Sequence, residues 1–391
     1  MNRACPVCGG KSGEVIRKIH MTLPEDLPLP GQYDVVSCVR CGFCYADTSA
    51  TQEDYDAYYV NYNSYSEEET GKSFESRFVR IREMLESHLD LTSRIVDFGF
   101  GNGNILLRLR AAGYQNLVGL DPSRETVEHG KERGIEAFQR NLYDDPGPLR
   151  ERFDAVILTY VMEHLLHPKL GLQRAGSYLR DNGYLIVEFP DYSMCDHVNL
   201  PIPNQFNQEH INYFSDCSFA NLLHGTGLQV VSAQSLPLDE GLRDSLEYGC
   251  LFLLQKCGGD PSAPASDFER DTKTKIHIER YLSRQESHGL ELQRQIETLN
   301  RERTPLVIWG TGAFTMSLLA STVLDKCNIV AFADGNPLKV GTSILGMPVI
   351  APEDVGCYPD AAILICAMKY GPQIRGKISE LGLKNRVINL I

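Results

Sequence analysis

The sequence has 391 residues, of which 42% are hydrophobic and 23% are charged, a balance that is ordinary for a globular protein with a buried core. Its net charge is −13 and it carries no basic stripe, so we expect no nucleic acid as a partner, because phosphates would be repelled. No apolar run reaches the roughly 20 residues of a membrane-spanning helix, so we expect no membrane partner. The length predicts two or three domains.

Twelve cysteines and a start without the apolar core of an export signal favour a reducing, cytoplasmic location and metal ligation rather than disulfides. Two C-x-x-C pairs, Cys5 with Cys8 and Cys38 with Cys41, predict a tetrahedral Zn²⁺ site. Four thiolates leave no open position for water, so we expect this zinc to be structural. The alternative is a set of reduced, buried cysteines. Cys44 is expected to be a packing residue.

The next stretch is rich in tyrosine and ends in an amphipathic helical pattern around Phe78, Ile81 and Leu85. Tyr62 is predicted to cover the acceptor of a reaction, although plain aromatic packing explains the cluster equally well. We therefore assign residues 1–70 to a zinc-binding lobe with an aromatic lid.

Residues 71–260 alternate between short apolar runs and helical patterns, which predicts an α/β core with a mostly parallel sheet. The four clearest strand candidates are Arg94–Phe98, Asn116–Leu120, Ala155–Leu158 and Tyr184–Phe189.

Alternating glycines directly follow the first of these strands. Gly99, Gly101 and Gly103 let the chain turn sharply and approach a ligand, and Asp97 precedes them. Asp121 ends the next strand, where a carboxylate accepts hydrogen bonds from ribose hydroxyls. The spacing favours S-adenosylmethionine over a dinucleotide, because a sulfonium cofactor has no pyrophosphate to seat on the helix terminus. Another nucleotide or a degenerate Rossmann unit remains the alternative.

Two further cofactor contacts are predicted near the ends of later strands. Asn141 follows the short run Ala137-Phe138, and its amide can both donate to and accept from an adenine edge. A simple loop asparagine explains it equally well. Tyr160 follows the strand candidate at 155–158 and is predicted to lie beside the cofactor.

Two glutamate–histidine pairs follow strands of the core, so we expect both at the edge of the sheet where ligands bind. They are Glu163-His164 and Glu209-His210. Histidine titrates near neutrality and a neighbouring carboxylate can raise its basicity, so Glu209 and His210 suit proton abstraction. A purely structural role is the alternative for both histidines.

Residues 261–304 are predicted to form a linker and a polar helix, roughly 267–303. Residues 305–391 are predicted to form a second Rossmann-like domain, because Gly310-Thr311-Gly312 follows an apolar run and Asp334 ends the next strand, 329–333. A lone short glycine motif is a weak signal, so we expect this domain to frame a substrate cleft rather than bind a cofactor.

In its motifs and their order, the whole chain resembles the zinc-containing sugar C-methyltransferases of deoxysugar pathways. The motifs that carry the resemblance are the four cysteines, Asp97-x-Gly99-x-Gly101-x-Gly103, Glu163-His164, Glu209-His210-x-x-Tyr213-Phe214, Asp334-x-Asn336-Pro337-x-Lys339-x-Gly341 and Gly346-x-Pro348-Val349.

This resemblance implies a class I methyltransferase core between the zinc lobe and the C-terminal domain, and a nucleotide-linked keto-deoxysugar as substrate. It implies that His210 removes a proton beside the carbonyl, with Glu209 beside it, and that His164 assists the enolate. Methyl transfer to oxygen or nitrogen stays open, as does a scaffold that binds the cofactor without turnover. The sequence leaves open whether the protein is a monomer or a dimer.

Overall fold

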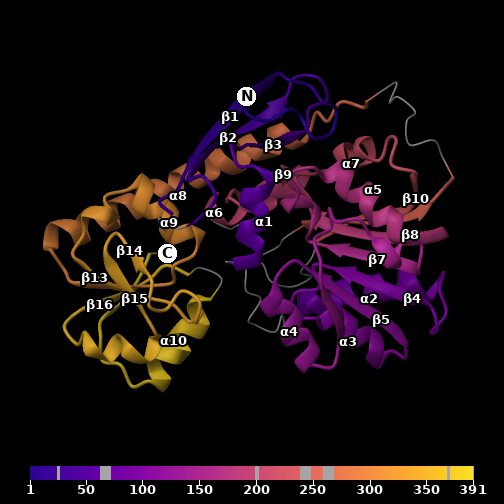
Figure 1. The fold of residues 1–391 in the computed structure, drawn as a ribbon. Coiled ribbons are helices and arrows are strands. Elements are labelled where there is room, and N and C mark those ends of the chain that lie inside the picture. Colours follow the sequence, from indigo (N-terminus) through magenta and orange to yellow (C-terminus); the bar gives the residue numbers. More distant parts are fainter. Residues whose placement is uncertain are drawn as a thin grey trace. The chain divides into compact units, whose positions relative to one another are not determined.

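The computed structural model describes residues 1–23, 27–61, 72–198, 202–237, 248–258, 268–367 and 370–390 (Figure 1). The chain divides into two compact units. The first comprises Met1–Arg17, Asp34–Asn199 and Glu209–Tyr281, and the second comprises Lys18–Tyr33, Leu200–Gln208 and Leu282–Ile391. The division into segments 1–70, 71–260, 261–304 and 305–391 stays a prediction. Within the described ranges, no helix is both long and apolar enough to span a membrane.

A small sheet near the N-terminus has the strand order β1-β2-β3-β9. Its strands are β1 (Gly13–His20), β2 (Gln32–Cys38), β3 (Cys44–Asp47) and β9 (Asn212–Tyr213). β3 pairs antiparallel with both β2 and β9, and Cys44 lies opposite Tyr213. This pairing fixes the segment just before β9, which contains His210, against the N-terminal lobe.

The alternating glycines follow a strand of a seven-stranded sheet of order β10-β11-β8-β7-β4-β5-β6. Its strands are β4 (Arg94–Phe98), β5 (Asn116–Asp121), β6 (Glu136–Gln139), β7 (Phe153–Thr159), β8 (Leu179–Pro190), β10 (Leu228–Pro237) and β11 (Tyr248–Lys256). The strands from β8 through β6 run parallel, and β10 and β11 add two antiparallel pairings. The predicted mostly parallel sheet is confirmed.

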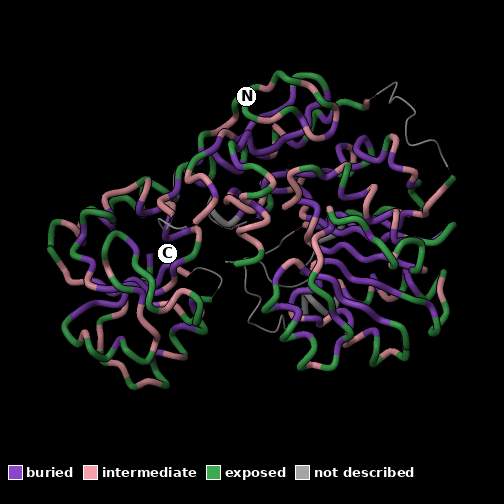
Figure 2. Tube along the Cα trace, in the orientation of Figure 1, coloured by how far each residue is buried: buried purple, intermediate pink, exposed green. Residues whose placement is uncertain are grey.

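Both faces of this sheet are buried, which explains why its strands are continuous apolar runs. In β4, Val96 belongs to one core and its neighbour Ile95 to the other. α2 (Lys72–Glu86), α3 (Asn104–Ala111) and α4 (Arg124–Glu132) contribute to the Ile95 core. The Val96 core includes residues of α5 (Pro168–Tyr178), α7 (Asp216–Leu222) and the cysteine lobe. Figure 2 shows the buried strands between exposed helix surfaces.

The predicted elements are largely confirmed, although several differ in length from the prediction. Phe78, Ile81 and Leu85 all lie buried on α2, as the amphipathic pattern predicts. β8 begins at Leu179 rather than at Tyr184, because Leu179 pairs with Phe153 and a register shift follows. The intervening residues read as a turn, and Asn182 indeed has a positive φ of 61°.

The long polar helix α8 (Thr274–Glu302) begins later than the predicted 267. Asp271 accounts for this start, because its Oδ1 accepts hydrogen bonds from the backbone N–H groups of Lys273 and Thr274, both at 3.0 Å. The predicted linker at 261–267 lies outside the described residues.

The C-terminal sheet has the order β14-β15-β13-β12-β16-β17, and every pairing in it is parallel except that of β14 with β15. Its strands are β12 (Leu306–Trp309), β13 (Ile329–Ala333), β14 (Ser343–Ile344), β15 (Met347–Ile350), β16 (Ala362–Ile365) and β17 (Val387–Asn389), and its helices include α9 (Ala313–Ser321) and α10 (Gly371–Glu380). The predicted strand 329–333 is confirmed as β13. Trp309, the only tryptophan of the sequence, lies in the core of this domain.

Candidate functional site

The loop between β4 and α3 adopts the conformation that its three glycines predict. Gly99, Gly101 and Gly103 have φ values of 67°, 53° and 76°, in the left-handed region that favours glycine. A Cβ on Gly99 would approach the Val161 side chain to 2.9 Å, and one on Gly103 would collide with Ile135. The loop therefore excludes larger residues at Gly99 and Gly103.

Asp97, the last but one residue of β4, is buried beneath this loop with 1% of its surface exposed. Burial, together with the nearby Asp121, raises the pKa of its carboxyl well above the usual range, although Arg77 lowers it. In the described part of the chain, no donor reaches its Oδ1 atom. An ammonium group of a ligand would satisfy this buried acceptor, and the amino-acid end of S-adenosylmethionine carries such a group.

Asp121 ends β5 on the neighbouring strand and is 2% exposed. Burial raises the pKa of its carboxyl to about 7, although backbone hydrogen bonds from Ser123 and Gly101 lower it. Its Oδ1 accepts the N–H of Ser123 at 2.9 Å. This carboxylate at a strand end is suited to accept hydrogen bonds from the two hydroxyls of a ribose.

One pocket brings Gly99 and Asp121 together with residues from other parts of the sequence. Its lining includes five of the predicted site residues, namely Gly99, Asp121, Asn141, Tyr160 and His164. It also includes one side of α1 (Gln52–Asn61), the helix at the start of the tyrosine-rich stretch. Gln52, Tyr55, Asp56 and Tyr59 of this helix were not predicted as site residues.

Asn141 lines the pocket, but its side chain is already engaged by the protein. Its Nδ2 donates to Asp56 Oδ1 at 2.6 Å, and its Oδ1 accepts the N–H of Tyr143 at 3.0 Å. The predicted adenine contact of Asn141 stays a prediction, and the structure adds Asp56 to the same wall of the pocket.

Tyr160 lies directly after β7 with a φ of 54°, an uncommon conformation for a non-glycine residue. Its N–H donates to the Glu188 carbonyl oxygen at 2.8 Å. The Arg77 guanidinium lies 4.3 Å from the centre of its ring, and Arg77 Nε lies 3.2 Å from both carboxylate oxygens of Glu188. The sequence analysis missed Arg77 and Glu188; a charged residue inside the apolar strand β8 was the available signal.

His164 and His210 come together in space. His164 also contacts the backbone of Glu209, the neighbour of His210, although 45 residues separate His164 from Glu209 in sequence. Their ring centres lie 4.9 Å apart in an edge-to-face arrangement. Burial lowers the pKa of His164 to about 4, and burial together with His164 lowers the pKa of His210 to about 3, although Glu209 raises it. Both imidazoles are therefore neutral near pH 7.

The glutamates of the two pairs differ in what they contact. Glu209 Oε1 accepts a hydrogen bond from the Tyr58 hydroxyl at 2.5 Å, and its backbone oxygen lies 3.1 Å from His164 Nδ1. Glu163 Oε1 lies 3.7 Å from His164 Nε2. The donor atoms of Glu163, His164 and His210 lie within 4.8 Å of one another, a set of types that is able to hold a divalent cation. The predicted Tyr62 lies outside the described residues.

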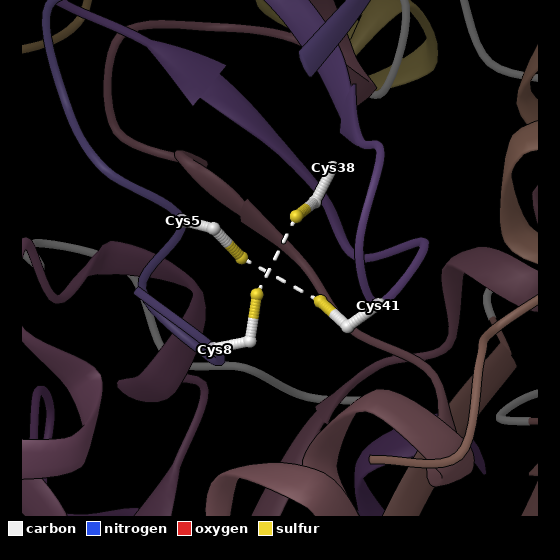
Figure 3. Close-up of side chains that lie close together, drawn as sticks. All are labelled: Cys5, Cys8, Cys38 and Cys41. Carbon is white, nitrogen blue, oxygen red and sulfur yellow. Dashed lines mark hydrogen bonds between the residues drawn. The ribbon is translucent and has the colours of Figure 1, made fainter. Parts of the chain in front are cut away.

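The four cysteines of the two C-x-x-C pairs converge from two tight turns (Figure 3). Cys5 Sγ lies 3.6 Å from Cys41 Sγ, and Cys8 Sγ lies 3.5 Å from Cys38 Sγ. All twelve cysteines lie in the described ranges and are free thiols. A tetrahedron of four thiolates around zinc has sulfur–sulfur edges of about 3.8 Å, since Zn–S bonds are about 2.3 Å long. The donor set and its dimensions therefore fit Zn²⁺.

Two segments of the chain match two different protein families. Residues 73–233 match the family described as "Methyltransferase domain", and residues 303–389 match the family described as "C2185-like, N-terminal". The ubiquinone biosynthesis O-methyltransferase of Azorhizobium caulinodans is 32% identical over 99 residues, which are 24% of this chain and 39% of that protein. The enzyme of the same name from Bradyrhizobium diazoefficiens is 29% identical over 99 residues, 24% of this chain and 38% of its own. The chain thus spans about two fifths of these curated relatives.

Among solved structures, the [4+2]-cyclase SpnF shares 14% identity and a TM-score of 0.38, covering 51% of this chain and 88% of its own. A SAM-dependent methyltransferase from Methanosarcina mazei shares 15% identity and a TM-score of 0.38, covering 44% and 97%. The family match coincides with the glycine loop, the buried Asp97 and the strand-end Asp121. Residues 73–233 are therefore a class I S-adenosylmethionine-dependent methyltransferase domain with a Rossmann-like fold.

Proposed function

We propose that the protein transfers a methyl group to a carbon atom beside the carbonyl of a nucleotide-linked keto-deoxysugar. The observation that carries this proposal is the pair of buried, neutral imidazoles, His164 and His210, next to the cofactor pocket. A carbon acid needs both a base and a stabilising group for the oxyanion that develops, whereas a phenol or an amine manages with less. The resemblance to sugar C-methyltransferases supports the class of acceptor.

In this mechanism the bound S-adenosylmethionine supplies an electrophilic methyl group. Asp97 would hold its ammonium group and Asp121 its ribose. His210 accepts the proton from the sugar carbon. His164 Nδ1 faces the backbone oxygen of Glu209, which assigns the hydrogen to Nδ1 and the lone pair to Nε2.

This assignment shapes the proposed role of His164. Because its Nε2 carries a lone pair, His164 stabilises an enolate only after it has taken up a proton. Glu163, 3.7 Å from Nε2, would stabilise the resulting imidazolium. Glu209 supports the histidines through its backbone oxygen, and Tyr58 holds its carboxylate.

The experiment that tests this function uses a panel of nucleotide-linked keto-deoxysugars. In deuterated water without methyl donor, we expect exchange of the proton beside the carbonyl, and with donor we expect demethylated cofactor, both followed by mass spectrometry. Replacing His210 by alanine should lower turnover by about 10²–10⁴-fold, the usual contribution of a general base, and leave cofactor affinity nearly unchanged. Glu209→Ala should also lower turnover. Unchanged rates in both variants would remove the base from the proposal.

A second candidate, transfer to oxygen, is favoured by the similarity to ubiquinone biosynthesis O-methyltransferases. An oxygen acceptor loses its hydroxyl proton and leaves the carbon-bound hydrogens in place. Methyl transfer without any exchange at carbon would therefore establish this second candidate, and cofactor binding without turnover would indicate a scaffold.

The proposal includes a structural Zn²⁺ held by Cys5, Cys8, Cys38 and Cys41. Purified protein should contain about one zinc per chain by elemental analysis, as one closed four-thiolate site requires. Cys38→Ser should lose this zinc and lower the melting temperature. Cys357→Ser, at an exposed cysteine outside the cluster, is the matched control and should keep the zinc. Zinc retained in Cys38→Ser at the wild-type amount would contradict the assignment.

A further inference from the structure

Helix α1 presents one face to the cofactor pocket. The four pocket-lining residues of α1 are Gln52, Tyr55, Asp56 and Tyr59, spaced as i, i+3, i+4 and i+7. Residues at this spacing share one side of an α-helix. The first turns of α1 therefore form one wall of the pocket. α1 belongs to the same compact unit as Asp121 and Asn141.

The amide of Gln52 has a fixed orientation on this wall. Its Nε2 donates to Asp56 Oδ1 at 2.9 Å, and Asn141 Nδ2 donates to the same oxygen at 2.6 Å. An ionised carboxylate only accepts hydrogen bonds, so the amide must turn its NH₂ group toward Asp56. Rotating the amide would set two oxygen acceptors against each other. The Oε1 atom of Gln52 is therefore held away from Asp56.

This Oε1 atom is buried and has no hydrogen-bond donor within the parts of the chain that the structure describes. Leaving a buried acceptor unsatisfied costs about 1–3 kcal/mol. Most buried polar atoms in native proteins are satisfied, so an acceptor that lacks a donor on the wall of a pocket is a candidate for a hydrogen bond from a ligand.

The chemistry of the cofactor identifies this donor. The pocket that contains Asp121 for the ribose is also lined by Pro122, Asn141 and Leu142, which follow the strand ends. The adenine is attached to the ribose, and its 6-amino group is the exocyclic donor on its edge. Gln52 lines the same pocket as Asp121, and its Oε1 is an acceptor without a donor in the described part of the chain.

We propose that Gln52 Oε1 accepts a hydrogen bond from the adenine 6-amino group, and that Asp56 and Asn141 are positioning residues for the Gln52 amide. Gln52 then discriminates adenosyl from inosyl ligands, because a 6-oxo group would place an acceptor against Oε1. This inference rests on the cofactor of the proposed function and is independent of the methyl acceptor.

The test is isothermal titration calorimetry of the zinc-containing full chain with S-adenosylhomocysteine and with S-inosylhomocysteine. Wild-type protein should bind the adenosyl ligand about 10–100-fold more tightly, the effect of about 1.4–2.7 kcal/mol. Gln52→Leu should bind S-adenosylhomocysteine about tenfold more weakly, and its preference over the inosyl ligand should fall to within about threefold.

Two further variants complete the test. Gln173→Leu removes a glutamine amide on α5, whose Nε2 donates to the Gly225 carbonyl oxygen away from the pocket lining, and should keep the wild-type preference. Asp56→Asn can donate to Gln52 Oε1, so it allows the Gln52 amide to rotate and should reduce the preference; this variant decides the matter if Gln52→Leu does not fold.

The outcomes separate this inference from the proposed function. Wild-type protein that prefers neither ligand, or a preference that survives in Gln52→Leu or in the deciding Asp56→Asn, would overturn the role of Gln52 while leaving the methyltransferase intact. No binding of S-adenosylhomocysteine to wild-type protein would overturn the cofactor assignment and this inference with it.

Discussion

The chain contains two strand–loop–helix–strand units, one around Gly99 and one around Gly310. In each, an aspartate lies at the end of the second strand: Asp121 in the first unit and Asp334 in the second. The two carboxylates have different surroundings. Burial raises the pKa of Asp121 to about 7, whereas the pKa of Asp334 is lowered: burial raises it, but Lys339 and hydrogen bonds from Thr311 and Asn336 outweigh this effect.

The loop of the second unit satisfies its own carboxylate. Asp334 accepts the N–H groups of Thr311 and Asn336, each at 2.9 Å, and also contacts the Thr311 hydroxyl and the Lys339 ammonium. In the first unit, Ser123 and the glycine loop supply only backbone donors to Asp121. Because the loop of the second unit already holds Asp334, and because the methyltransferase family matches residues 73–233, we expect the cofactor to bind in the first unit.

We expect the largest effect on stability from replacing a glycine in one loop but not in the other. Gly103→Ala should lower the free energy of unfolding by about 2–4 kcal/mol, because φ is 76° there and the new Cβ would collide with Ile135. Gly312→Ala should change it by no more than about 0.5 kcal/mol, because φ is −80° and open space surrounds the position. Urea unfolding followed by circular dichroism measures both.

Equal destabilisation by the two substitutions would show that the loops are under the same constraint. Cofactor affinity provides a second reading: Gly103→Ala should weaken binding of S-adenosylhomocysteine, whereas Gly312→Ala should bind it like the wild type.

A smaller effect concerns pH. The raised pKa of about 7 means that Asp121 in the unliganded protein is protonated below pH 7, and this protonated form is the stabilised one, so its contribution is lost as pH rises through 7. Ribose hydroxyls favour the ionised form, so binding at low pH must release a proton. Affinity for S-adenosylhomocysteine should fall about tenfold from pH 8 to pH 6. Calorimetry in buffers of different ionisation enthalpy measures this.

The matched aspartates serve as controls for the pH effect. Asp121→Asn should bind more weakly and show little dependence between pH 6 and pH 8. Asp334→Asn should keep the wild-type dependence, because that carboxylate is expected to have no part in cofactor binding. A tenfold change that persists in Asp121→Asn would assign the titration to another group.

Local patterns in the sequence predicted the parts of the site that depend on neighbours along the chain. The loop between β4 and α3 requires three glycines because its backbone has positive φ values at these positions. The two cysteines of each C-x-x-C pair lie in one turn. These features are encoded over a few residues, so sequence spacing was sufficient to find them.

Contacts between distant segments could not be predicted in this way. Sequence adjacency paired Glu209 with His210, and this pairing stays a prediction. It gave no sign that the Glu209 carboxylate contacts Tyr58 or that the Glu209 backbone oxygen faces His164. Sequence patterns likewise gave no sign that Gln52 of α1 and Asn141 both donate to Asp56 Oδ1. No periodicity reports which side chains of two distant elements will meet.

The position of Trp309 has a practical consequence for studying the two units. This residue is buried in β12, and the sequence contains no other tryptophan. Its fluorescence therefore reports on the C-terminal sheet alone, while circular dichroism sums the whole chain. A ligand that stabilises only the methyltransferase domain should leave the emission transition in place and move the dichroism transition, so one titration can show which half of the molecule a compound has bound.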